Sequence, residues 1–245
     1  KNFDQSADAY DHFEERHHLF ETLSKRQLEL IEPSRPERIL DVGCGTGIST
    51  IALLQAMPGQ SPNIYAIDIS ERMLLRARER CKALPGVYFI RGDAENLTSY
   101  FNEAFDAIFY TASIFLLPGF AESLRQAYNL LVPGGVLSIS FYAGLFDETG
   151  NDAIRKAFPE QKYQYGAVPV GDLVTCLESL PGTRTTRIVT GSKSAANSFS
   201  TSFRFPRNLP AFSRRSRTWN GSRRSAISAI SLRRGWTRLS WVGSS

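Results

Sequence analysis

The sequence predicts an α/β protein built on a doubly wound, mostly parallel sheet of the Rossmann-like type. Five apolar stretches of strand length are separated by stretches with helical periodicity. A turn rich in glycine follows the first of these strands. Acidic residues stand at the ends of the first three strands, and the carboxyl edge of such a sheet is where ligands bind.

Length and composition exclude several classes of protein. The chain has 245 residues, enough for one large domain with an appendage. No apolar run reaches 18 residues, and the N-terminus lacks the apolar stretch of a signal peptide. Three unclustered cysteines argue against a disulfide framework and against a metal site. We therefore expect a cytoplasmic protein that does not enter a membrane.

Residues 1–36 have helical periodicity and end at two prolines, so they are predicted to form an N-terminal helical lid. The stretch Phe3–Asp11 resembles the leader of the quinone-biosynthesis and malonyl-carrier-protein methyltransferases, where such a segment helps to cover the cofactor. All three histidines lie in this lid. Two interpretations stay open: the lid is a packing helix with solvated histidines, or Tyr10 or a histidine faces the site.

The first strand runs into Asp41, and Gly43, Cys44, Gly45 and Gly47 form a tight turn before an amphipathic segment. Glycines let a ligand approach the backbone and the positive end of the following helix. D-x-G-x-G-x-G resembles the cofactor loop of the class I S-adenosylmethionine-dependent methyltransferases. A dinucleotide fingerprint would place its third glycine where Ile48 stands.

The second and third strands end in the same manner. Asp68 ends the stretch 63–68, and a carboxylate there can accept both ribose hydroxyl protons. Asp93 and Ala94 follow the stretch 87–90 in a G-D-A-x-x-L pattern that again resembles the methyltransferases. The resemblance implies that Asp93 bonds the adenine amine and that Ile69 and Ala94 flank the ring.

The fourth strand, 105–110, ends at Tyr110, which the resemblance places near the sulfonium. The sequence that follows lacks the acidic or Asn-Pro-Pro-type motif with which some family members hold an amine, so the acceptor chemistry stays open. A helix over 122–131, a Pro-Gly-Gly turn and a fifth strand then resemble the family at their expected place.

Charge is divided unevenly along the chain. Residues 1–178 hold 16 Lys and Arg against 24 Asp and Glu, whereas residues 179–245 hold 13 Lys and Arg, 15 serines and no acidic residue. The tail is interpreted as translated out of frame, as a disordered extension or as an RNA-binding arm. Translation out of frame is favoured because the tryptophans of the tail show no helical or strand periodicity. Such a tail would leave the sheet incomplete.

A helix over 171–180 and strands over 184–190 and 199–205 are the candidates for completing the sheet. The predicted division is therefore a lid over 1–36, an S-adenosylmethionine-binding methyltransferase domain over 37–178 and a basic Ser/Arg-rich tail over 179–245.

Together these features predict an enzyme that uses S-adenosyl-L-methionine to methylate a small-molecule acceptor by in-line displacement. Asp41 is expected to brace the turn, and the backbone of Gly43, Cys44 and Gly45 to meet the methionine end of the cofactor. No catalytic residue is identified, and a nucleic-acid partner is not expected. The alternatives are an RNA-binding or RNA-methylating protein that uses the tail, a dinucleotide oxidoreductase and an inactive remnant. The sequence leaves the acceptor, the methylated atom and the oligomeric state open.

Overall fold

The structure is a computed structural model that describes residues 3–5, 7–29, 36–102, 104–146, 168, 170–181, 183–192 and 224–234. Its helices are η1 (Phe3–Gln5), α1 (Ala7–His17), α2 (Leu19–Glu29), α3 (Ile48–Gln55), α4 (Glu71–Cys81), η2 (Ala94–Ser99), η3 (Ile114–Leu116), α5 (Phe120–Asn129) and α7 (Val170–Glu178). Its strands are β1 (Arg38–Val42), β2 (Asn63–Asp68), β3 (Val87–Arg91), β4 (Phe105–Thr111), β5 (Leu131–Phe146), β6 (Thr183–Ser192) and β7 (Arg224–Arg234).

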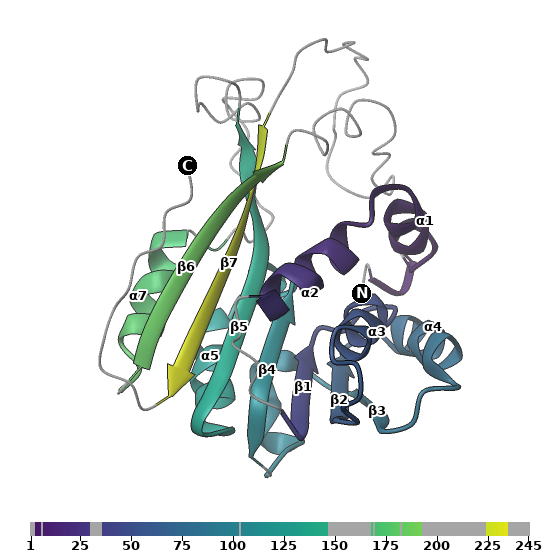
Figure 1. The fold of residues 1–245 in the computed structure, drawn as a ribbon, viewed down its shortest axis with the longest axis horizontal. Helices are drawn as coiled ribbons and strands as arrows, with labels where there is room; N and C mark the ends of the chain where they lie inside the picture. The colour runs from purple at the N-terminus through teal and green to yellow at the C-terminus, as the bar shows by residue number, and fades with distance from the viewer. Residues whose placement is uncertain are drawn as a thin grey trace.

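The strands form one twisted sheet in the order β3-β2-β1-β4-β5-β7-β6 (Figure 1). The first five pair in parallel, and β7 is antiparallel to both β5 and β6. The strand order reverses between β1 and β4, so a crevice opens at the carboxyl ends of these two strands. The predicted doubly wound, mostly parallel sheet is confirmed.

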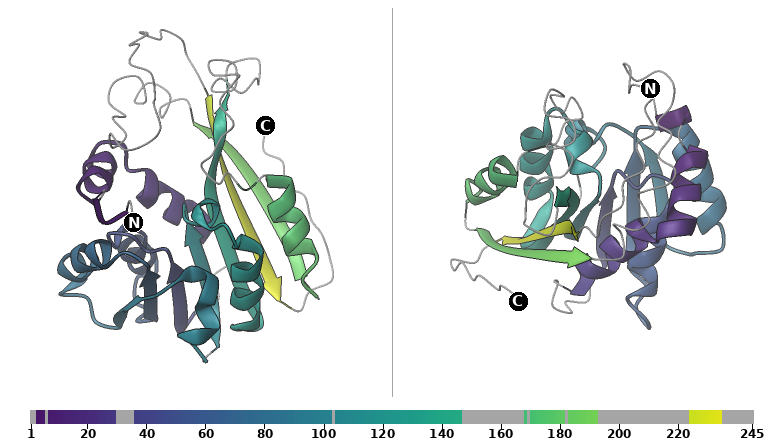
Figure 2. Two further views of the ribbon diagram at one scale, coloured as in Figure 1. Left: turned by 180° about the vertical axis from the view of Figure 1, so that it is seen from behind. Right: turned by 90° about the horizontal axis from the view of Figure 1, so that it is seen from above.

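Helices cover both faces of this sheet, which is why its central strands are apolar on both sides. Helix α2 lies in front of β4 and β5 in Figure 1, and α5 and α7 lie on the opposite face, seen from behind in Figure 2. The larger apolar cluster packs between the sheet and α5 and α7, and a smaller one packs β1, β2 and β4 against α3. The two clusters fix the strand ends from which the site is built.

The last two strands agree only in part with the sequence-based expectation. Helix α7 and strand β6 lie where the candidates over 171–180 and 184–190 were predicted. The inserted strand β7 is Arg224–Arg234, whereas the predicted strand over 199–205 lies outside the described residues. Two segments of the Ser/Arg-rich tail thus take part in the sheet.

Candidate active site

A cavity of about 340 Å³ lies at the carboxyl ends of β1, β2, β3 and β4. It is bounded by the turn after β1, by the residues that follow the other three strands, and by side chains of the N-terminal lid. Its lining residues are Phe3, Tyr10, Phe20, Gly43, Cys44, Gly45, Thr46, Ile48, Ser49, Ile67, Asp68, Ile69, Met73, Gly92, Asp93, Ala94, Glu95, Thr111, Ala112, Ser113, Leu116, Leu117 and Pro118.

The turn after β1 needs its glycines for backbone conformation and for space. Gly43, Gly45 and Gly47 all have positive φ, at 73°, 54° and 84°. A Cβ on Gly43 would lie 2.5 Å from the Cβ of Ser113, and one on Gly47 would lie 3.1 Å from the Cβ of Ala77 on α4. A Cβ on Gly45 would meet nothing within 4 Å, because this residue borders the open cavity. Gly47 begins α3 and does not line the cavity.

The backbone N–H groups of this turn donate within the protein. Those of Gly43 and Cys44 donate to the carbonyl of Ile67, at 2.8 and 3.2 Å, and that of Gly45 donates to Asp68 Oδ2 at 2.9 Å. The turn therefore offers a ligand close approach more than free N–H donors. The thiol of Cys44 is buried, and burial followed by the charges of Asp41 and Asp68 raises its pKa, so it stays protonated.

Asp41, which was expected to brace the turn, is buried next to it at the end of β1 and does not line the cavity. Its Oδ2 accepts hydrogen bonds from the hydroxyls of Ser49 and Thr50 on α3, each at 2.7 Å. Its Oδ1 has no partner within the described residues. Burial raises the pKa of Asp41 to about 6, against the lowering effect of the two hydroxyls.

Asp68 lies at the tip of β2 and points toward the glycine turn. Its Oδ2 accepts from the Gly45 N–H and its Oδ1 from the Ser70 N–H, both at 2.9 Å. Burial raises its pKa, and the backbone N–H groups of Ser70 and Gly45 oppose that effect. A carboxylate has about four acceptor positions, so both oxygens retain lone pairs for a further donor in the cavity.

Asp93 and Ala94 line the cavity after β3, and Ile69 lines it after β2 with 58% of its surface exposed. Asp93 caps η2 by accepting from the Glu95 N–H through Oδ1 at 2.9 Å, which leaves Oδ2 available. Glu95 also lines the cavity and accepts from the Gly119 N–H at 2.7 Å. The carboxylates predicted from three strand ends therefore converge, two in the cavity wall and Asp41 beneath it.

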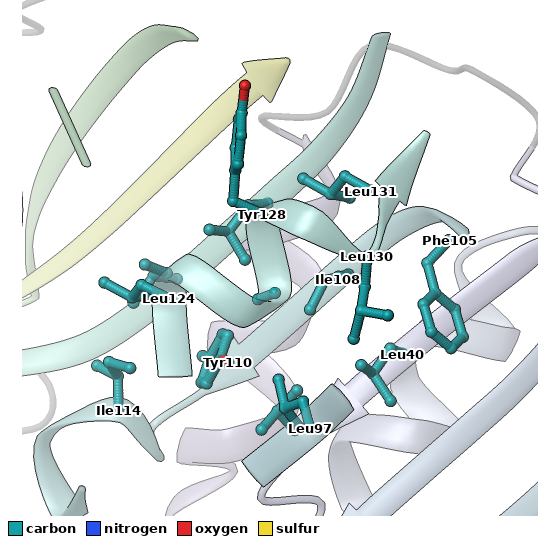
Figure 3. Packing of buried hydrophobic residues seen from close by; sticks show 14 of the residues in the cluster. Leu40, Leu97, Phe105, Ile108, Tyr110, Ile114, Leu124, Tyr128, Leu130 and Leu131 are labelled. Atoms are coloured by element: carbon teal, nitrogen blue, oxygen red, sulfur yellow. The ribbon is translucent and has the colours of Figure 1, made fainter. Parts of the chain in front are cut away.

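The predicted position of Tyr110 beside the sulfonium is wrong. Its ring is fully buried between the sheet and α5, among Leu97, Ile114 and Leu124 (Figure 3), and it does not line the cavity. Its hydroxyl is bonded to the Ser123 hydroxyl at 2.7 Å. Because successive side chains of a strand point to opposite faces, it is the next residue, Thr111, that reaches the cavity.

Thr111 and the two residues after it line the cavity, although none of them was among the site residues predicted from the sequence. Ala112 has a φ of 52°, a strained conformation for alanine, and its N–H donates to the Ser140 carbonyl at 2.8 Å. Ser113 donates its hydroxyl to the Val42 carbonyl at 2.6 Å, which ties the end of β4 to the end of β1.

The lid contributes aromatic rings, not histidines. Tyr10 and Phe20 stack with centroids 5.7 Å apart and line the cavity together with Phe3. Burial, and then the charge of Asp68, raises the pKa of Tyr10, so the phenol stays protonated at neutral pH. His12 and His18 have side chains 88% and 66% exposed and pair with neighbouring glutamates, while the side chain of His17 lies outside the described residues. Of the two interpretations, Tyr10 facing the site is supported.

Ion pairs fasten the lid to α4. Asp8 pairs with Arg72 and Arg76, and Asp11 pairs with Arg76 at 3.1 Å and Arg80 at 2.8 Å. Arg80 also donates to the carbonyl of Thr46 in the glycine turn. The three arginines recur every four residues along α4 and therefore share one face of the helix, a spacing visible in the sequence.

The fold and this site resemble those of class I methyltransferase domains. A family model described as a methyltransferase domain matches residues 39–135. The chain is 31% identical over 150 residues to a malonyl-[acyl-carrier protein] O-methyltransferase of Halalkalibacterium halodurans, covering 58% of this chain and 54% of that protein. It is 35% identical over 162 residues to a trans-aconitate 2-methyltransferase of Escherichia coli, covering 65% and 59%.

Solved structures agree on the fold. The N-methyltransferase NodS from Bradyrhizobium japonicum, crystallised with S-adenosyl-L-homocysteine, superposes with a TM-score of 0.60 at 16% identity, covering 96% of this chain and 99% of that one. The chain spans about half the length of the curated relatives it matches. In the part of the chain that the structure describes, no helix is long and apolar enough to cross a membrane.

Proposed function

We propose that this protein transfers the methyl group of S-adenosyl-L-methionine to a small-molecule acceptor. The cofactor supplies an activated methyl on a sulfonium, and an acceptor atom displaces the thioether in line. The protein's own contribution is to orient the two partners and to keep water out. The observation that carries the proposal is the convergence of Asp68, Asp93 and the open face of Gly45 on one cavity.

The residues present fit the adenosyl group. Asp68 has acceptor positions left for the two ribose hydroxyls. Asp93 bonds η2 through Oδ1, so its Oδ2 is available to the adenine amine. Ile69 and Ala94 line the same cavity and would provide apolar surface for the two faces of the adenine. The family match over residues 39–135 and the relatives that carry methyltransferase names support the same assignment.

The acceptor enters next to the lid in this proposal. Tyr10, Phe20 and Thr111 line the cavity there, and the relatives are named for acids, quinols and carrier-bound malonyl groups. Among the described lid residues, those that line the cavity are Phe3, Tyr10 and Phe20, and none of them takes up a proton at neutral pH, since the phenol of Tyr10 is protonated there. We therefore propose an acceptor that ionises by itself or reacts at carbon. The RNA-binding alternative gains no support, because two segments of the tail lie in the sheet.

Isothermal titration calorimetry with S-adenosyl-L-homocysteine tests the assignment. Asp68→Ala is expected to weaken binding by about 1–3 kcal/mol, because the ribose hydroxyls lose a charged acceptor. Glu71→Ala is the matched control: it removes a carboxylate three residues further on, whose partner Arg78 lies on the same helix, and affinity should not change. Unfolding in urea checks that each variant is folded. Equal affinity of Asp68→Ala and the wild type would remove the ribose assignment.

A further inference from the structure

The charged residues that line the cavity are all acidic. Asp68, Asp93 and Glu95 line it after β2 and β3, and among the lining residues in the part of the chain that the structure describes there is no lysine, arginine or histidine. A carboxylate acceptor bound in this cavity would therefore meet like charges without a cationic side chain to pair with. Taking a charge out of water without a partner is unfavourable.

Basic side chains lie close to the cavity, but they pair with other groups. Arg76 and Arg80 on α4 form ion pairs with Asp11 of the lid, at 3.1 and 2.8 Å. His12 and His18 each lie 3.2 Å from the carboxylate of a glutamate three residues further along the chain. None of these four basic residues lines the cavity. The arginines hold the lid against α4, so they do not serve as partners for a ligand.

The negative charge acts on the side of the cavity that the lid covers. Burial, and then the charge of Asp68, raises the pKa of Tyr10, which belongs to the lid helix α1. In the proposed function the acceptor enters beside this residue. A negative unit charge within about 12 Å of one carboxylate loses about tenfold in affinity at an effective dielectric constant of about 20. The methyl donor brings one net positive charge, which can offset only one of the three carboxylates.

This charge separates the two kinds of acceptor that the proposed function admits. An acceptor that ionises by itself becomes an anion, which the carboxylates disfavour. An acceptor that reacts at carbon can attack while it is uncharged, and positive charge then passes onto it. The same carboxylates stabilise that positive charge. A protonated amine would be attracted as well, but it has no free electron pair with which to attack.

The lid side of the wall is rich in aromatic rings. The rings of Tyr10 and Phe20 stack with centroids 5.7 Å apart, and the ring centroid of Phe3 lies 6.4 Å from that of Tyr10. All three residues line the cavity, as do Leu116 and Leu117. A flat aromatic ligand gains stacking or edge-to-face contacts with such rings in addition to apolar burial. The lid therefore favours an aromatic acceptor over an aliphatic one.

We propose that the acceptor is an uncharged, electron-rich aromatic compound that is methylated at a ring carbon, and that Phe3, Tyr10 and Phe20 select for it. The inference rests on the proposed function and names its class of substrate. The ring carbon gives an electron pair to the methyl carbon, and the bond from the methyl carbon to sulfur breaks with its pair left on sulfur. The ring, now positively charged, releases the proton of the attacked carbon to water and becomes aromatic again.

Calorimetric titration of the complex with S-adenosyl-L-homocysteine tests this, with 2-naphthol and 2-naphthoate as probes. The two compounds share one ring system, and at neutral pH only 2-naphthoate carries a charge. The wild type should bind 2-naphthol at least about tenfold more tightly. Glu95→Gln removes one charge of the wall and keeps an oxygen for the Gly119 N–H, so this preference should fall about two- to tenfold. Glu122→Gln is the matched control, because it removes the same charge outside the cavity and should leave the preference unchanged.

Phe20→Leu tests the aromatic contact. It keeps most of the apolar volume and removes the ring, so 2-naphthol should bind about two- to tenfold more weakly. Phe13→Leu is its control. The ring of Phe13 packs against that of Phe20 with centroids 6.1 Å apart, but Phe13 does not line the cavity, so the affinity should be kept. Unfolding in urea checks that each variant is folded.

Equal or tighter binding of 2-naphthoate by the wild type would overturn the inference, and so would a complex with S-adenosyl-L-homocysteine to which 2-naphthol does not bind. Equal losses of affinity in Phe20→Leu and Phe13→Leu would overturn the role of the lid rings. Methyl transfer to the oxygen of 2-naphthol, detected by NMR of the product, would overturn attack at carbon. In each of these cases the proposed function stands. If S-adenosyl-L-homocysteine itself does not bind, the proposed function fails.

Discussion

Alanine substitutions at two glycines can show whether Gly45 contacts the ligand or serves only the conformation of the backbone. Gly45 and Gly59 both have positive φ, 54° and 75°, and a Cβ on either would meet nothing within 4 Å. Alanine at either position therefore costs the same kind of backbone strain, about 1–2 kcal/mol of stability. Only Gly45 borders the cavity. Gly45→Ala should thus lose ligand affinity as well as stability, and Gly59→Ala stability alone.

Gly47 should affect stability more than ligand affinity, unlike Gly45. A Cβ there would lie 3.1 Å from the Cβ and 3.2 Å from the Cα of Ala77, so α4 would have to move. Overpacking adds about 1–3 kcal/mol to the backbone strain, and Gly47→Ala should lose about 2–5 kcal/mol in total. Because Gly47 does not line the cavity, the loss of affinity should be smaller than for Gly45→Ala when both variants are measured fully folded.

Urea unfolding provides the stabilities, and calorimetric titration with S-adenosyl-L-homocysteine provides the affinities. The predicted order of destabilisation is Gly47→Ala first, with Gly45→Ala and Gly59→Ala equal. The predicted loss of affinity is at least about tenfold for Gly45→Ala, because a methyl group would occupy space that the ligand needs. Wild-type affinity in Gly45→Ala would refute the placement of the ligand against this turn.

Three further perturbations test the surroundings of the site. Burial raises the pKa of Asp41 to about 6, above its unfolded value of 3.8, so its contribution favours the folded state at low pH and is lost as pH rises from about 4 to 6. In Asp41→Asn, the change of the free energy of unfolding over this pH range should be smaller by up to about 3 kcal/mol, as measured by urea unfolding at several pH values. The same pH dependence in the variant and the wild type would contradict this prediction. Arg80→Met removes bonds to Asp11 and to the carbonyl of Thr46, and should cost about 1–2 kcal/mol of stability and abolish part of the salt dependence of ligand binding. If ligand affinity changes equally between low and high salt in the wild type and in Arg80→Met, then ion pairs do not hold the lid in place. Ala112→Gly relieves a φ of 52° and should raise stability by about 0.5–1 kcal/mol; a lower melting temperature would count against strain at that residue.

The sequence was sufficient for those features that a short stretch determines by itself. Asp68 follows an apolar strand and precedes an N-cap serine, so its place at the strand tip could be predicted from neighbouring residues alone. Tyr110 shows the limit. Its strand is buried on both faces, so apolar and polar residues do not alternate along it. The sequence therefore could not predict toward which face of the sheet each side chain points.

Other parts of the site depend on contacts between distant segments. Gln27 and Thr111 are 84 positions apart, and nothing in either local sequence indicates that they meet. The strand Arg224–Arg234 follows a long Ser/Arg-rich stretch, so its pairing with β5 was not visible as a pattern of apolar residues. The arginines of α4 were a missed signal, because their four-residue spacing puts three positive charges on one helix face, and the lid carries Asp8 and Asp11 on one face of its own helix.

A crystal structure of this protein with S-adenosyl-L-homocysteine would test the central claim most directly. Both ribose hydroxyls should lie within hydrogen-bond distance of the Asp68 carboxylate. The adenine should lie between Ile69 and Ala94 with its amine toward Asp93, and the thioether should lie near Thr111. A ligand bound outside this cavity, or one whose ribose does not contact Asp68, would show that the proposed site is wrong.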